Sequence, residues 1–119
     1  MKIDKSLLSG STSLLVLSLL KSGDKYGYEM ISLLEAVSNE VFQMKEGTLY
    51  PILHNLEKKG FVQAYNQDND KGRSRRYYHL TDKGAAQLAE ERNQWEVFAG
   101  AVNTVLRLAA GAAETLSTD

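Results

Sequence analysis

The sequence contains no cysteine and only one proline in 119 residues. The absence of cysteine excludes disulfide scaffolds, thiol nucleophiles and cysteine-ligated metal centres, and it fits a reducing cytoplasm. The longest apolar run, residues 14–20, contains Ser18 and is too short to span a bilayer. The first residues lack an apolar segment followed by a small-residue cleavage site. We therefore expect a cytoplasmic protein with no signal peptide and no membrane partner.

Sequence signatures of catalysis and cofactor binding are missing as well. The chain has no GxSxG, GxxxxGK[ST] or HExxH motif and no glycine-rich turn typical of dinucleotide binding. Its two histidines, His54 and His79, are too far apart in sequence and too few to indicate a metal or acid–base site. We therefore expect no catalytic residue, no cofactor and no metal ion.

The net charge of −1 by itself indicates no polyanionic partner, but the charges are distributed unevenly. Residues 43–83 contain eight basic and five acidic residues, a net charge of +3. The remainder contains six basic and ten acidic residues, a net charge of −4. A basic segment inside an acidic frame predicts a localised positive surface. A solvated charged loop is the alternative explanation.

Hydrophobic periodicity predicts four helices, at residues 6–21, 25–38, 46–59 and 82–108. Asp24 and Thr81 are expected to cap the second and the fourth of them. In the third helix four apolar side chains share one face at i, i+3, i+4 and i+7. These are Leu49, Ile52, Leu53 and Leu56. Gly60 is expected to end this helix in the left-handed conformation.

Between the third and fourth helices the period changes from 3.6 to 2, which predicts a β-hairpin. The expected strands are residues 61–65 and 75–80, joined by a polar turn. Because side chains alternate along a strand, Tyr78 shares the inner face with Leu80. The opposite face then carries Arg75, Tyr77 and His79.

Three helices followed by a two-stranded hairpin are the order of elements in a winged helix-turn-helix. The predicted fold class is therefore mostly α with a small β-hairpin, followed by a long C-terminal helix. We expect a winged helix-turn-helix DNA-binding domain at residues 1–81, and a C-terminal dimerisation helix and tail at residues 82–119. In this architecture the third helix enters the major groove, and the hairpin, or wing, lies along the phosphate backbone.

This architecture selects the candidate DNA-binding residues. The outward face of the third helix is rich in hydrogen-bond donors, and the wing carries long cations that neutralise phosphates. The candidates are Lys45, Thr48, Tyr50, His54, Asn55, Lys58, Lys71, Arg73, Arg75 and Arg76. Alternatively, Tyr50 and Pro51 only set the geometry of the helix, and the wing arginines belong to a solvated loop. Tyr26 and Tyr28 are expected to pack, and Gly27 to permit close approach of helices.

Three stretches of the sequence resemble the PadR family of bacterial transcriptional regulators. They are Tyr26–Met30, Gly47–Gly60 and Arg76–Gly84, of which the second, GTLYPILHNLEKKG, is the most specific. The resemblance covers roughly residues 7–108 and is greatest to the small, LmrR-like branch with a single helix after the wing. The chain departs from the family at Lys45-Glu46, where a serine–proline pair is frequent, and at Ser74, where proline or a basic residue is frequent.

The last predicted helix implies a second copy of the chain. About 27 residues of helix extend roughly 40 Å, which is longer than a small winged-helix core covers. Its apolar stripe therefore needs another surface, and a symmetric dimer supplies one. The candidate interface residues are Leu88, Trp95, Phe98, Ala99, Val102, Val105 and Leu106. The alternative is that this helix folds back on the first helix.

The resemblance to the LmrR-like branch further implies that Trp95 lies at the dimer interface. In that branch two symmetry-related indoles flank a pore that accepts flat aromatic compounds. Trp95, Phe98 and Ala99 would then form an effector pocket, since an indole offers a rigid stacking face. The alternative is that Trp95 is an interface anchor without any ligand.

Two functional hypotheses follow from these observations. The first is a sequence-specific, homodimeric DNA-binding regulator, most simply a repressor, which binds a pseudo-palindromic operator and is released by a small planar aromatic effector. The second is a winged-helix protein-interaction module without DNA readout, in which the wing arginines bind an acidic partner. Salt-dependent binding to a DNA duplex distinguishes the two hypotheses, because only the first requires it.

Overall fold

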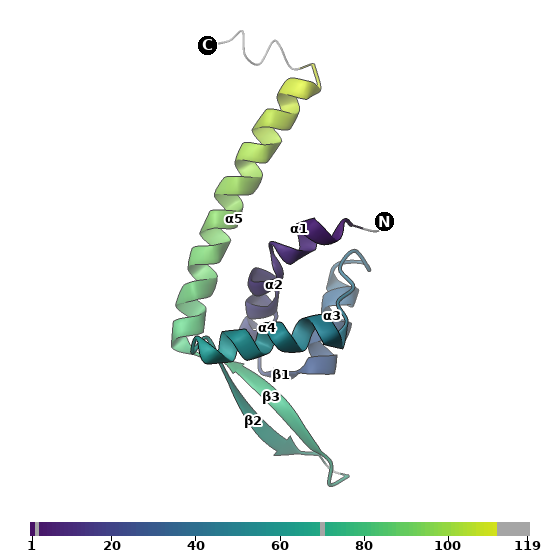
Figure 1. Ribbon diagram of the computed structural model, residues 1–119, viewed down its shortest axis with the longest axis vertical. Helices are drawn as coiled ribbons and strands as arrows, with labels where there is room; N and C mark the ends of the chain where they lie inside the picture. The colour runs from purple at the N-terminus through teal and green to yellow at the C-terminus, as the bar shows by residue number, and fades with distance from the viewer. Residues whose placement is uncertain (2, 70, 112–119) are drawn as a thin grey trace. The chain divides into compact units, whose positions relative to one another are not determined.

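The computed structural model describes residue 1, residues 3–69 and residues 71–111. Figure 1 shows the order of its helices and strands. They are α1 (Lys5–Ser9), α2 (Thr12–Lys21), β1 (Lys25–Tyr26), α3 (Gly27–Val37), α4 (Glu46–Lys58), β2 (Val62–Asp68), β3 (Ser74–Leu80) and α5 (Asp82–Ala109). The chain forms two compact units, Met1–Leu88 and a second that begins at Ala89. The predicted fold class, a winged helix-turn-helix with a long C-terminal helix, is confirmed.

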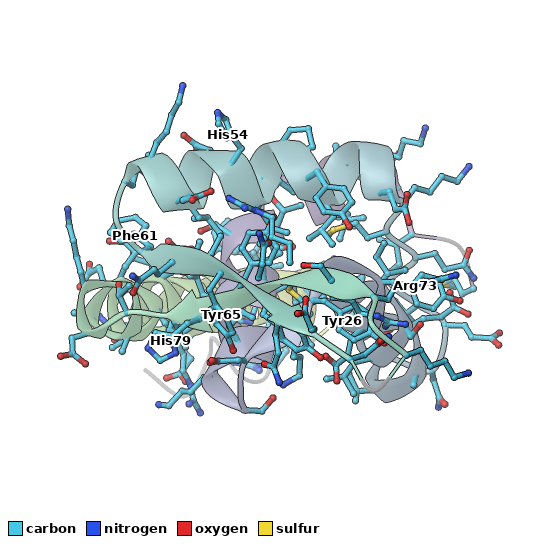
Figure 2. The ribbon with its side chains drawn as sticks, turned by 90° about the horizontal axis from the view of Figure 1, so that it is seen from below. Tyr26, His54, Phe61, Tyr65, Arg73 and His79 are labelled. Atoms are coloured by element: carbon cyan, nitrogen blue, oxygen red, sulfur yellow. The ribbon has the colours of Figure 1, made fainter. Side chains whose placement is uncertain are left out.

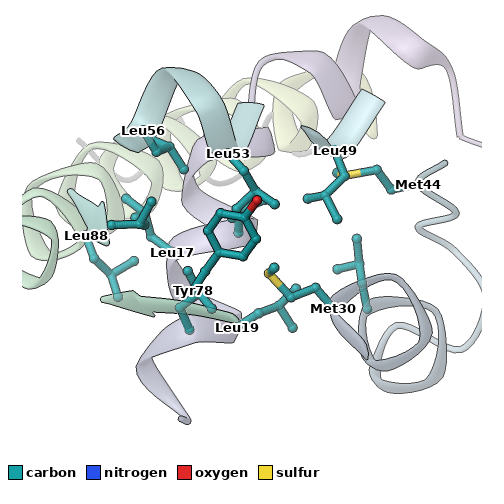
Figure 3. Close-up of a cluster of buried hydrophobic side chains, with 13 residues drawn as sticks. Leu17, Leu19, Met30, Met44, Leu49, Leu53, Leu56, Tyr78 and Leu88 are labelled. Carbon is teal, nitrogen blue, oxygen red and sulfur yellow. The ribbon is translucent and has the colours of Figure 1, made fainter. Parts of the chain in front are cut away.

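The first unit has one hydrophobic core, formed where α2, α3 and α4 pack on one another and against the sheet. Leu17 of α2, Met30 of α3 and Leu53 of α4 are almost completely buried in it. Figure 3 shows these side chains around the ring of Tyr78, which comes from β3. Burying one such side chain stabilises the folded state by about 2 kcal/mol. The core therefore fixes α4 against the sheet that carries the wing.

The sheet has three antiparallel strands in the order β1-β3-β2. β2 and β3 form the predicted hairpin, with Tyr65 opposite Tyr77, and both strands are longer than expected. β1 was not expected, because residues 25–38 were predicted to be one helix. The prediction was wrong at its start: Lys25 and Tyr26 pair with Tyr78 and Tyr77, and the helix begins only at Gly27. Backbone partners on a distant strand leave no local periodic signal.

The prediction of a single first helix was also wrong. Residues 6–21 contain two helices that are separated at Gly10 and Ser11. The hydroxyl of Ser11 donates to the carbonyl oxygens of Leu7 and Leu8 at 3.3 and 3.1 Å. Serine side chains that bind the preceding turn in this way compete with continuous helix.

Helix α4 and both predicted helix boundaries around the wing are confirmed. Leu49, Leu53 and Leu56 are buried, while Ile52 is half-buried at the edge of the same face. Gly60 follows the helix with φ of 80°, as expected for a left-handed cap. At the start of α5 the backbone N–H of Gly84 donates to the hydroxyl of Thr81 at 3.0 Å, which is the predicted cap.

The start of α5 belongs to the first unit, so the boundary between the units lies inside this helix and not at residue 81. Gly84 is buried, and a Cβ atom at this position would meet the backbone carbonyl of Phe61 and the side chain of Leu80. Leu88 is 5% exposed and is part of the hydrophobic core. Leu88, which was predicted to lie at a dimer interface, is thus already covered by its own domain.

Candidate nucleic-acid interface

The outward face of α4 is polar and accessible along its length. Thr48, Tyr50, His54, Asn55 and Lys58 are exposed, as is Lys45, which precedes the helix. Figure 2 shows His54 pointing away from the sheet. Side chains with this arrangement on the second helix of a helix-turn-helix reach base edges in the major groove. The five candidates on α4 and Lys45 before it are thus all accessible.

The N-terminus of α4 lacks a side-chain cap. Lys45 occupies the N-cap position in an extended conformation and makes no side-chain capping bond. This absence agrees with the departure from the family pattern at Lys45-Glu46. Glu46 in the first turn compensates in part, because a carboxylate near a helix N-terminus is favourable.

The tip of the wing is held by Asn69. Its side-chain oxygen accepts the backbone N–H groups of Lys71 and Arg73, both at 2.9 Å. Gly72 between them has φ of 75°, a conformation that favours glycine. The backbone that carries Lys71 and Arg73 therefore has a defined turn, and both side chains project into solvent.

The other two wing arginines are engaged differently. The guanidinium of Arg75 lies 4.4 Å from the centre of the Tyr26 ring, a cation–π contact. On the opposite face of β3, Nη2 of Arg76 lies 3.5 Å from Oε2 of Glu57 on α4. Exposed pairs of this kind contribute little stability, so Arg76 can exchange Glu57 for phosphate at low cost. Arg75, in contrast, would lose its cation–π contact with the Tyr26 ring if its guanidinium moved to bind a phosphate.

A shallow depression of about 490 Å³ brings the wing, the start of α3 and α4 together. It is lined by Tyr26, Gly27, Tyr28, Glu46, Tyr50, Arg73, Arg75 and Arg76. In Figure 2 Tyr26 and Arg73 lie toward the same end of the sheet. Four of the lining residues are candidates predicted from the sequence. Tyr26, Gly27, Tyr28 and Glu46 were not. The first three come beside the wing only because β1 pairs with β3.

Tyr50 connects the depression to the face of α4. Its side chain is 42% exposed, and its ring end lies against the backbone of Gly27. Burial of the phenol raises the pKa of Tyr50 above its usual value, and the carboxylate of Glu46 adds to the effect. The phenol therefore stays a neutral hydrogen-bond donor throughout the physiological range.

A second polar cluster ties the wing to the turn before β1. The phenol of Tyr65 donates to Oδ2 of Asp24 at 2.7 Å, and Nδ1 of His79 lies 2.8 Å from Oδ1 of the same carboxylate. The hydrogen bonds with His79 and Tyr65 lower the pKa of Asp24, and the bond to Asp24 raises the pKa of Tyr65. Asp24 was predicted to cap a helix, but here it anchors both wing strands.

The second unit, which carries the remaining interface candidates, leaves its apolar side chains exposed. Trp95 is 48% exposed, and Phe98, Val102, Val105 and Leu106 are exposed as well, while Ala99 is half-buried. The rings of Trp95 and Phe98 lie 6.0 Å apart between their centres. Val97 is also exposed, but helical spacing places it on the other side of α5 from Val102.

The described ranges contain neither a metal-binding cluster nor a membrane-spanning helix. Residues 1, 3–69 and 71–111 contain no group of three histidine, aspartate or glutamate side chains that could hold a metal ion. Over the same residues, none of the helices combines the length and the apolar character needed to cross a membrane.

Comparison with known proteins agrees with the geometry of α4 and the wing. Residues 16–90, from α2 to the start of α5, match the transcriptional regulator PadR-like family. The sequence is 36% identical over 93 residues to protein X of Lysinibacillus sphaericus, which covers 78% of this chain and 85% of that protein.

Solved structures show the same likeness. The fold is similar to a transcriptional regulator from Clostridium thermocellum, with a TM-score of 0.79, 30% identity and coverage of 86% of this chain and 96% of that one. It is also similar to a PadR-like transcriptional regulator from Bacillus cereus, with a TM-score of 0.75, 29% identity and coverage of 86% and 97%. With the polar outward face of α4, its cationic wing and this family match, the chain belongs to the PadR-like family of transcriptional regulators, which bind DNA.

Proposed function

We propose that this chain is a homodimeric repressor that binds a pseudo-palindromic operator through α4 and the wing and is released by a planar aromatic compound. The observation that carries the DNA-binding part is the depression in which Tyr50 of α4 and the arginines of the wing lie together. Helix α4 offers Tyr50, His54 and Asn55 for base edges, and the wing offers Lys71 and Arg73 for phosphates. A regulator seated on its operator in this way blocks access to the promoter.

The exposed stripe on α5 supports the dimer. Trp95, Phe98 and Val102 follow one another at the spacing of a coiled-coil seam, and all three are exposed in a single chain. A second copy is the simplest surface that covers a stripe which its own domain leaves exposed. Two copies place two recognition helices on one face of DNA, with half-site centres about one helical turn, roughly 34–36 Å, apart.

DNA binding is tested by a salt titration of the arginine variants. A duplex containing the region upstream of the chain's own gene is titrated with the wild type and with the Arg73→Ala, Arg75→Ala, Arg76→Ala triple variant. Loss of phosphate contacts should weaken binding to every sequence and make the log–log salt slope shallower by roughly one for each lost contact per protomer. An unchanged slope would assign these arginines to a solvated loop.

The base-reading role of α4 is tested in the same titration. Tyr50→Ala and His54→Ala should alter the preference among duplex sequences and leave the salt slope unchanged, because contacts to base edges release no counterions. A wild type that binds acidic proteins but no duplex would support the protein-interaction module instead.

The effector is tested by fluorescence, because Trp95 is the only tryptophan. Its indole is half-exposed and lies beside Phe98, so two copies would bring four aromatic rings to one seam. Flat aromatic dyes should quench its emission saturably and lower the affinity for the duplex. Trp95→Ala should abolish dye binding and leave the dimer formed. Emission that no flat compound changes would make Trp95 a plain interface anchor.

A further inference from the structure

Gly27 is the first residue of α3 and lies directly beneath the ring of Tyr50. A Cβ atom built at position 27 would meet the hydroxyl of Tyr50, with Cζ at 2.8 Å and Cε1 at 3.0 Å. Real Cβ atoms essentially never lie that close to another heavy atom, so the ring occupies the space that a side chain at position 27 would need. Gly27 itself is buried.

The backbone conformation gives no separate reason for glycine at this position. Gly27 does not have a positive φ, and it lies in helical backbone that alanine adopts readily. What its lack of a side chain provides is therefore room for the ring of Tyr50, contributed by the neighbouring helix.

The atoms that would collide belong to the far end of a side chain and not to the backbone. Tyrosine can move its ring by rotating two χ angles, whereas a backbone carbonyl moves only with its chain. Gly84 shows the opposite situation, because a Cβ there would meet the backbone carbonyl of Phe61. A methyl group at position 27 therefore redirects Tyr50 without unfolding α3 or α4.

The position of the Tyr50 ring decides what α4 presents to a duplex. Seated on Gly27, the ring lies in the depression between Glu46 and the wing arginines, next to the outward face of α4. Turned away from Gly27, the ring would leave this place, and its hydroxyl would no longer be presented to a duplex from the same position.

We propose that Gly27 is a positioning residue for DNA recognition, which seats the Tyr50 ring on the first turn of α3 and so sets the sequence preference of α4. This inference rests on the proposed DNA-binding function. Gly27 contributes specificity although it has no side chain with which to touch a base.

The first test compares two glycine-to-alanine variants. Gly27→Ala should lower the ratio of affinities for a duplex selected by the wild type from a random pool and for a scrambled duplex by about tenfold, the size of one base-edge contact. The salt slope should not change, and the thermal unfolding midpoint should not fall. Gly100→Ala is the matched control, because a Cβ there meets nothing within 4 Å. An unchanged affinity ratio for Gly27→Ala would overturn the proposal.

The second test asks whether Gly27 acts through Tyr50. In a Tyr50→Ala background the collision is removed, so adding Gly27→Ala should change the affinity ratio no further. If instead the effects of the two substitutions multiply, position 27 acts independently of the ring and the proposal is wrong.

The third test needs no DNA and so separates this inference from the proposed function. In the free wild-type protein, NMR should show close contacts between the Gly27 Hα protons and the Tyr50 ring, and Gly27→Ala should abolish them. The pKa of the Tyr50 phenol should fall toward its ordinary value in the same variant. Absence of the contact in the wild type would show that the Tyr50 ring does not lie against Gly27, and the proposal would be wrong. A seated ring in a protein that binds no duplex specifically would overturn the proposed function and, with it, the role of Gly27 in recognition.

Discussion

Leu88 and Trp95 lie one heptad apart on the same face of α5, yet their surroundings are opposite. Leu88 is 5% exposed and packs in the core of the first unit, whereas Trp95 is 48% exposed in the second. The first unit covers its own apolar residues with three helices and a sheet. The second unit consists, over its described residues, of one helix, which has no other element to cover its stripe.

The difference shows that one hydrophobic period can serve two purposes along a single helix. Up to Leu88 the period seats α5 on its own domain, and from Trp95 onward it is available to another surface. Substitutions in the first unit should therefore act through stability within one chain. Substitutions on the exposed stripe should act through association and depend on protein concentration.

Gly84→Ala should have the largest effect, because it breaks the self-contained unit from within. A Cβ at this position meets the backbone carbonyl of Phe61, and Leu80 Cδ1 at 2.7 Å, so α5 must shift away from the sheet. We expect the free energy of unfolding to fall by about 3 kcal/mol, the upper range for overpacking. Urea denaturation, together with hydrogen exchange of the amides in α4, measures the loss.

The control for this prediction is Gly100→Ala on the same helix, where the methyl group meets open space. Alanine there should stabilise the helix by about 0.5–1 kcal/mol. Equal responses at positions 84 and 100 would contradict the distinction between the two parts of α5.

Val102→Glu tests the exposed stripe. A symmetric dimer would bury two such carboxylates without a partner, at a cost of about 1 kcal/mol for each copy and about 2 kcal/mol for the dimer, so the dissociation constant of the dimer should rise roughly 30-fold. Sedimentation across a range of concentrations should show the shift from twice 13.2 kDa toward 13.2 kDa.

Val97→Glu is the matched control, since it introduces the same charge from the same residue type on the opposite face of α5. It should leave association unchanged. A dimer that tolerates Val102→Glu but is broken by Val97→Glu would place the interface on the other face of the helix.

Asp24→Asn should have the smallest effect. It tests whether the exposed hydrogen bonds of Asp24 with Tyr65 and His79 stabilise the first unit within a single chain. Because the folded state lowers the pKa of Asp24, the carboxylate stabilises the protein above its unfolded pKa of about 3.9, and this contribution is lost as pH falls through the folded value. The variant should lose about 0.5 kcal/mol at pH 7, the size for a solvent-screened pair.

The difference between Asp24→Asn and wild type should vanish toward pH 2, and it should not depend on protein concentration. Urea titrations at several pH values measure it. Tyr65→Phe, which removes one of the two hydrogen bonds to Asp24, should lose only part of this stability. A difference that grows as pH falls would exclude the carboxylate as its source.

Local sequence signals predicted α4, the hairpin and the cap at Thr81 because each depends on residues close together in the chain. The period of Leu49, Leu53 and Leu56 and the left-handed Gly60 belong to this class. Strand β1 escaped prediction since its hydrogen-bond partners are more than fifty residues away on β3. The break at Ser11 escaped because a serine hydroxyl bonded to the preceding turn leaves the apolar pattern intact.

The candidate site divides in the same way. The residue types on α4 and the wing were evident from composition and spacing. The depression was not, since Tyr26 and Tyr28 come beside the wing only after β1 has paired with β3. The separate engagements of Arg75 with Tyr26 and of Arg76 with Glu57 follow from the two faces of β3.

The sequence by itself determined the winged helix-turn-helix order, the positive charge of residues 43–83 and the apolar stripe on α5. Periodicity, helix caps and charge each depend on residues that are close together in the chain. Only the tertiary structure decided that Leu88 is core, that Asp24 anchors the wing and that Gly27 seats Tyr50. Each of these depends on which atoms from distant parts of the chain come into contact. Those contacts are determined by the packing of the whole core, because a close-packed interior leaves room for only one side chain at each position.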